Sequence, residues 1–132
     1  MPLESSVRMQ GLSRVLTGGP SDPDAGEHYR VPQRRLDDIE ELAGVEVCGI
    51  KIDVEDFEQY VFAGGRSLIE RCRPIVYTEL GVGENRRVSV KFFEDLRYVV
   101  GVLDGDDLVA WDPEVHTKHN FFMFPAERAP WL

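Results

Sequence analysis

The sequence predicts an α/β fold organised around a short sheet. Two apolar runs rich in β-branched residues, 45–54 and 74–80, are typical of buried strands. Apolar residues at helical spacing follow each run, and the chain ends in three β-rich pieces. Alternation of strands and helices of this kind favours a mixed α/β sheet over an all-helical or all-β architecture.

Length and charge restrict the class of protein. The chain has 132 residues, of which 42% are hydrophobic and 30% charged, enough for one domain with a core. The formal charge of −9 argues against non-specific binding to nucleic acid or to an anionic membrane, so we expect a small-molecule or protein partner. Two cysteines are too few for a secreted disulfide framework, and no apolar run is long enough to span a membrane. We therefore expect a cytoplasmic protein.

Residues 1–30 form an irregular or edge-strand N-terminal segment by this interpretation. Imperfect alternation over 5–12 and 13–16 predicts one or two edge strands, and turn residues crowd 17–26. Pro32 favours an extended conformation for the residues just before it. A short helix follows over 35–44, with its apolar residues on one face and Gly44 as the C-cap.

The central strand, within 45–54, carries acids at its carboxyl end. Its β-branched residues indicate burial on both faces, with Cys48 as a small buried hydrophobe. Asp53, Glu55 and Glu58 cannot be buried unpaired without a large cost, so they should lie where the chain leaves the core. In open α/β sheets this is the edge at which ligands bind. Solvation of the strand end and capping of the next helix explain the same acids equally well.

The remainder of the chain predicts helices and strands in turn. After residue 57 we expect a helical turn, a break at Gly64-Gly65 and a second helix ending near Arg71. The further predicted elements are a strand at 74–80, a helix at 89–96, β-rich pieces at 98–103, 107–111 and 120–124, a hairpin turn at 104–107, and a tail at 126–132.

Several motifs of the chain resemble those of the FkbM family of S-adenosylmethionine-dependent methyltransferases. They are Val31-Pro32 followed by Leu36-Asp37-Asp38-Ile39, then Ile50-Lys51-Ile52-Asp53-Val54-Glu55 with Phe57-Glu58, then Gly64, Arg73-Pro74 and Glu79. The similarity runs from about Val31 to Pro125 in the family's order and spacing. Two residues depart from its pattern: Asp56 replaces a glycine that could supply a positive φ, and Phe62 replaces a leucine.

The resemblance implies a partial Rossmann-like class I methyltransferase sheet, its second half. Residues 31–125 would be the C-terminal part of the domain, and S-adenosylmethionine would be the cofactor. The family binds this cofactor mainly through a glycine-rich loop after its first strand, and the chain contains no such loop; the lone G-x-G at 81–83 is a chance-level signal. The cofactor-binding residues are therefore left unassigned, and we expect an incomplete domain.

Methyl transfer to a hydroxyl requires a group that takes or orients its proton. We assign Asp53 and Glu55 as catalytic, and Glu58 and Glu79 as substrate-binding, on a small-molecule, sugar or glycan acceptor. Each could instead have a structural role. The three histidines show no convincing ligand spacing, so we expect no metal site built on them.

Two alternatives remain open. The chain could be a non-catalytic α/β remnant that binds a partner, or a second copy, through an open sheet edge. Alternatively, Asp53 and Glu55 could hold magnesium for phosphoryl chemistry, although this would require a phosphate-binding loop that the sequence does not show.

Overall fold

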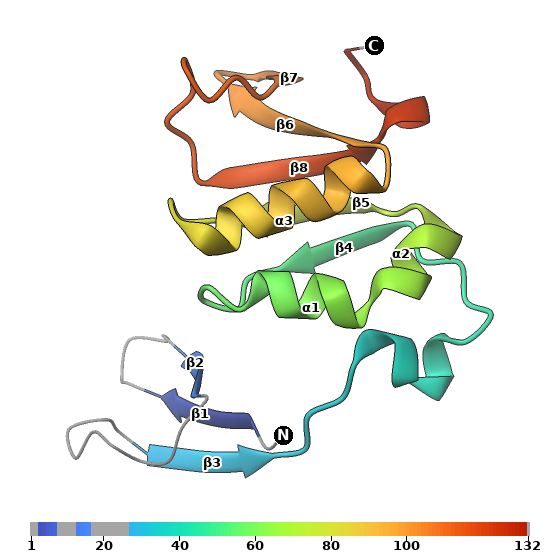
Figure 1. The fold of residues 1–132 in the computed structure, drawn as a ribbon, viewed down its shortest axis with the longest axis vertical. Helices are drawn as coiled ribbons and strands as arrows, with labels where there is room; N and C mark the ends of the chain where they lie inside the picture. Colours follow the sequence, from blue (N-terminus) through green and yellow to red (C-terminus); the bar gives the residue numbers. More distant parts are fainter. Residues whose placement is uncertain (1–2, 8–12, 17–26, 132) are drawn as a thin grey trace.

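The computed structural model describes residues 3–7, 13–16 and 27–131, which form two sheets that share no strand (Figure 1). In the smaller, antiparallel sheet, β1 (Leu3–Val7) lies between β2 (Ser13–Leu16) and β3 (Glu27–Val31). The predicted N-terminal strands are confirmed, but β1 is central rather than at an edge. Residues 8–12 and the predicted loop at 17–26 lie outside the described residues.

Two short 3-10 turns, η1 (Leu36–Asp38) and η2 (Glu40–Leu42), replace the helix predicted over 35–44. Ile39 separates them in an extended conformation, with ψ at 105°. A tertiary contact explains the difference. The Asp37 carboxylate accepts hydrogen bonds from the backbone N–H groups of Ser67 and Leu68, each 3.0 Å long, and so holds this segment against the start of a later helix.

The larger sheet has five strands in the order β4-β5-β8-β6-β7. Their bounds are Gly49–Ile52 for β4, Ile75–Glu79 for β5, Tyr98–Asp104 for β6, Asp107–Ala110 for β7 and Asn120–Pro125 for β8. β4 and β5 are parallel, and every other pair is antiparallel. The predicted hairpin at 104–107 joins β6 to β7, and Gly105 in its turn has φ at +63°.

Three α-helices pack on this sheet: α1 (Glu58–Gly64), α2 (Arg66–Cys72) and α3 (Glu84–Asp95). The predicted break at Gly64-Gly65 is confirmed. A Cβ on Gly65 would lie 2.9 Å from Leu36 Cδ1, so glycine allows the close approach of the 3-10 segment. α3 begins before its predicted start at Ser89, because the Gly83 conformation opens the helix earlier.

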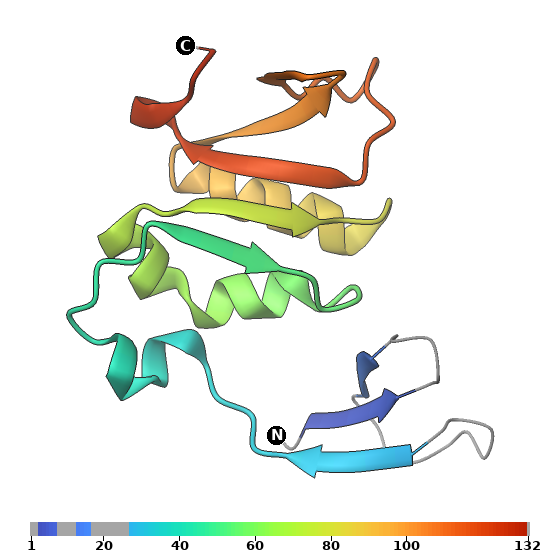
Figure 2. The ribbon, with the colours of Figure 1, turned by 180° about the vertical axis from the view of Figure 1, so that it is seen from behind.

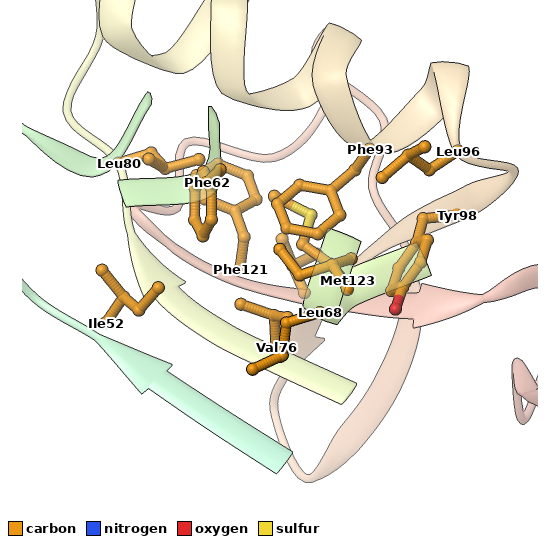
Figure 3. Close-up of a cluster of buried hydrophobic side chains, with 12 residues drawn as sticks. Ile52, Phe62, Leu68, Val76, Leu80, Phe93, Leu96, Tyr98, Phe121 and Met123 are labelled. Carbon is orange, nitrogen blue, oxygen red and sulfur yellow. The ribbon is translucent and has the colours of Figure 1, made fainter. Parts of the chain in front are cut away.

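The core lies between the sheet and the helices, which cover one of its faces (Figure 2). The Phe62 ring on α1 meets the Phe93 ring on α3 edge-on, with centroids 4.7 Å apart, and Phe93 lies 5.1 Å from Tyr98 (Figure 3). Other core side chains come from β4, β5, β6, β8, the helices and the residues that directly follow β5 and α3: Ile52, Leu68, Ile69, Val76, Leu80, Leu96, Val102, Phe121 and Met123.

β4 is not buried on both faces, so that prediction is wrong. It is the outermost strand of its sheet and has helices on one side only. Ile52 points to the covered face and is buried, while Val45 is 44% exposed and Cys48 is exposed. The opposite face carries Tyr77 and Phe122, whose ring centroids are 4.8 Å apart. The β-branched residues of 45–54 therefore led to an overestimate of burial, because β4 lies at the edge of the sheet.

Candidate functional site

Acidic side chains meet at the carboxyl edge of the two parallel strands. Asp53 follows β4 and Glu79 ends β5. Because Ile52 pairs with Thr78 in register, the residues that come next on the two strands are neighbours. Both carboxylates are exposed to solvent. The structure thus places Asp53 and Glu79, two of the four predicted site residues, side by side at the expected edge of the sheet.

The chain turns sharply after Val54, and this turn determines where the other acids lie. Glu55 has φ at +51° and Asp56 at +69°, a left-handed conformation that costs a residue other than glycine about 1 kcal/mol or more. Asp56 thus adopts the positive φ that the family's glycine at this position could supply. Asp56 is close to the next loop, since a Cβ on Gly81 would lie 3.6 Å from Asp56 Oδ1. The loops after β4 and β5 form one surface.

Like charges surround Glu55. Partial loss of solvent around its carboxyl group raises its pKa above the ordinary value of 4.5, although the side chain is exposed. The negative charges of Asp53, Glu79, Glu58 and Asp56 raise the pKa further, in that order. No described lysine or arginine forms an ion pair with Asp53, Glu55 or Glu79. This edge therefore favours a cation or a hydrogen-bond donor over an anion.

Replacing Glu55 with glutamine should stabilise the fold at neutral pH. The folded-state pKa of Glu55 lies above its unfolded value, so its contribution to stability is complete below pH 4.5 and is lost as the pH rises through the folded-state pKa. Glu55→Gln should raise the free energy of unfolding by a few tenths of a kcal/mol at pH 7 and leave it unchanged at pH 4. Urea unfolding at the two pH values measures the difference, with the exposed Glu94→Gln as control.

Glu58 lies beneath this surface rather than on it. It is only 1% exposed, and both of its oxygens accept hydrogen bonds, from Val54 N–H at 2.9 Å and from Asn85 Nδ2 at 2.8 Å. Asn85 Oδ1 in turn accepts the Gln59 N–H at 3.0 Å. The network connects the acidic loop, the start of α1 and the start of α3. Both Glu58 oxygens are thus engaged within the protein, where they hold the loop in position.

Sequence reasoning missed Asn85. It is 27 residues from Glu58 in the chain, and neither periodicity nor a local motif distinguishes it. Only the packing of α1 against α3 brings the two side chains together. The one available signal was the position of Glu58, which begins a helix directly after an acidic loop and so requires a hydrogen-bond donor when it is buried.

Arg86 on α3 fixes the start of β8 at the same edge of the sheet. Its guanidinium donates to the carbonyl oxygens of Leu80 and Lys118 and lies over the Phe121 ring, 5.0 Å from the centroid. Burial lowers the pKa of Arg86. This cation is therefore engaged with backbone oxygens and an aromatic ring, and it leaves the carboxylates of Asp53 and Glu79 uncompensated.

Two residues of the family-like motifs have structural roles. Asp37 bonds to the first turn of α2, as described above. Arg73, in the Arg-Pro pair, donates to the Leu96 and Arg97 carbonyl oxygens and forms a two-pronged ion pair with Glu127. Its guanidinium also lies 4.8 Å from the Tyr98 ring centroid. These motif residues hold the fold together away from the acidic edge.

The described residues offer little for metal binding. Within residues 3–7, 13–16 and 27–131, no three His, Cys, Asp or Glu side chains are placed so that they could share one metal ion. The magnesium hypothesis thus gains no support from this part of the chain. None of the helices described has the length and apolar character needed to cross a membrane.

Comparison with known families identifies the chain. The family model for the methyltransferase FkbM domain matches residues 4–100. The chain belongs to the FkbM methyltransferase family. Searches of curated proteins and of solved structures give no match.

The match includes the acidic edge of this FkbM domain. Residues 4–100 contain β4, β5 and the loops that carry Asp53, Glu55 and Glu79, together with Asn85 beneath them. The matched region also extends upstream of Val31, through the small N-terminal sheet. The β6–β7 hairpin and β8 lie mostly beyond it, and β8 supplies the sheet neighbour of β5.

Proposed function

We propose that this FkbM domain serves an S-adenosylmethionine-dependent methyltransferase that methylates a hydroxyl oxygen, with the reaction at the acidic edge. The supporting observation is the convergence of Asp53, Glu55 and Glu79 at the carboxyl ends of two parallel strands. Open α/β sheets bind their ligands at this edge. Family membership supports methyl transfer, and the carboxylates supply groups suited to handling a hydroxyl proton.

The charge of the edge suits this cofactor. S-adenosylmethionine carries a positively charged sulfonium, and the acids around Glu55 have no cationic partner among the described residues. Glu55, which the other acids surround, would help to stabilise that positive charge. When bound, the cofactor would supply an activated methyl group.

Asp53 would act on the acceptor. Its exposed carboxylate can accept a hydrogen bond from the acceptor hydroxyl and take the proton as the oxygen gains the methyl group. The Glu58–Asn85 network would hold the loop that carries Glu55 in position during this step. Glu79 would orient a second hydroxyl of the acceptor through its exposed oxygens.

Replacing Asp53 with asparagine should therefore reduce methyl transfer by about 100-fold or more, the usual size of a general-base contribution. The assay follows tritiated methyl groups from S-adenosylmethionine to a series of hydroxyl compounds, including a monosaccharide and a phenol. Glu94→Gln, an exposed acid on α3, should retain full activity. Equal transfer by Asp53→Asn and the wild type, or no transfer by the wild type to any compound, would refute the proposal.

A partner-binding role is the second candidate, and the free edge of β4 favours it. Gly49–Ile52 has a hydrogen-bonded neighbour on one side only, in the described sheet. A strand from a partner, or from a second copy, could add there. A chain that transfers no methyl group yet forms a stable dimer in analytical ultracentrifugation would favour this role.

A further inference from the structure

A second feature, a pocket of about 180 Å³, lies between α1 and the segment that leads into η1. One wall is formed by residues 33–36 and the other by Val54, Phe57, Tyr60, Val61 and Gly64. Both views show this segment passing alongside α1 (Figures 1 and 2). Val54 lines the pocket and is next to Asp53 and Glu55 in the chain, so the pocket adjoins the proposed reaction site.

The pocket has an aromatic wall of a defined shape. The rings of Phe57 and Tyr60 are 4.6 Å apart, and Tyr60 is 57% exposed. Leu36 and Val61 complete an apolar lining. An enclosed apolar cavity of about 150 Å³ holds one benzene ring, so this pocket of about 180 Å³ has room for a single ring. Flat rings make offset contacts with aromatic walls.

The opposite wall supplies positive charge. Arg34 and Arg35 both line the pocket and are exposed. Neither forms an ion pair with a carboxylate in the described ranges of the chain. The aliphatic part of Arg35 packs over Gly64, where a Cβ would lie 3.4 Å from Arg35 Cβ. In a protein of net charge −9, two arginines at an apolar pocket favour an anionic group on the ligand.

We propose that this pocket binds a planar aromatic ring that carries an anionic group. The ring would lie against Phe57 and Tyr60, and its anionic group would bond to Arg34 or Arg35. The role of this ligand rests on the proposed function: if the protein transfers methyl groups, the ligand is the acceptor. Its ring hydroxyl would then point past Val54 toward the carboxylates, and its anionic group away from them.

Three probes separate the two requirements, flatness and charge. 4-Hydroxybenzoate is flat and anionic, 4-hydroxybenzyl alcohol is flat and neutral, and cyclohexanecarboxylate is anionic and not flat. Each is titrated into ¹⁵N-labelled protein, without cofactor, and the amide signals of Tyr60, Val61 and Gly64 are followed. We expect saturable shifts with 4-hydroxybenzoate and binding about tenfold weaker or more for the other two.

Matched variants assign the effect to the pocket. The double variant Arg34→Gln, Arg35→Gln should lower the affinity for 4-hydroxybenzoate to that for the neutral probe. The double variant Arg87→Gln, Arg97→Gln removes the same charge elsewhere and should leave every affinity unchanged. Tyr60→Ala should lower the affinity for both aromatic probes. Equal affinity for all three probes, or shifts confined to other residues, would overturn the pocket proposal. Because these signals require no methyl transfer, a failure here is distinct from a failure of the proposed reaction.

Discussion

Replacing Phe62 with alanine is expected to lower the free energy of unfolding by about 4 kcal/mol, within the range for truncating a buried aromatic side chain. Phe62 is fully buried, and its ring contacts those of Phe92 and Phe93, with centroids 6.0 Å and 4.7 Å away. Truncation would leave a cavity between α1 and α3, where the rigid sheet prevents collapse. Urea unfolding followed by circular dichroism measures the loss.

Phe62→Leu is the informative control, because leucine is the residue that the family pattern has at this position. It keeps most of the apolar volume and should cost about 1 kcal/mol. Tyr60→Ala, on the exposed side of the same helix, should change the stability by less than about 0.5 kcal/mol. A loss in Phe62→Ala no larger than that in Tyr60→Ala would show that α1 does not pack against α3 as described.

Replacing Glu58 with alanine is expected to lower the free energy of unfolding by about 3 kcal/mol, because one buried donor and one part-buried donor lose their carboxylate acceptor. Val54 N–H and Asn85 Nδ2 would be left without the carboxylate oxygens that they contact at 2.9 and 2.8 Å. Glu58→Gln should recover only part of this. The two donors contact different oxygens of Glu58, and in glutamine an NH₂ group, which cannot accept, replaces one of them.

A double-mutant cycle with Asn85→Ala tests the network directly. The two side chains contact one another, so the combined loss should be smaller than the sum of the single losses by about 1 kcal/mol or more. Glu94→Gln serves again as the exposed control. Additive losses would mean that Glu58 and Asn85 stabilise the protein independently, and that the acidic loop is not held through them.

Local chemistry predicted most of the larger sheet and its helices. The glycine pair at 64–65 ended α1, and the turn residues at 104–107 formed the hairpin. Prediction failed where a distant contact overrode local preference. Asp37 bonds to α2 rather than supporting a helix of its own, and β4 lies at an edge that β-branched residues alone do not reveal. Burial depends on neighbours, and hydropathy along one strand does not report them.

The acidic edge was predicted more completely than the roles of its residues. Parallel pairing of β4 with β5 placed Asp53 beside Glu79, as the strand pattern indicated. Sequence reasoning did not predict that Glu58 is buried beneath the turn at Glu55 and Asp56. The hydrogen bond that holds Glu58 there comes from Asn85 of α3, which is distant in the sequence. The pocket of Phe57 and Tyr60 is likewise absent from any local motif, since its second wall comes from residues before η1.

We infer that the carboxyl edge of β4 and β5 forms the methyltransferase site. Titration of S-adenosylmethionine into ¹⁵N-labelled protein tests this placement, at concentrations up to about 10 mM so that weak binding is still seen. We expect saturable shifts of the amide signals of residues 53–56 and 79–81, with affinity weakened by Glu55→Gln and unchanged by Glu94→Gln. Saturable binding that leaves these signals unmoved, or no shift at any concentration, would contradict it.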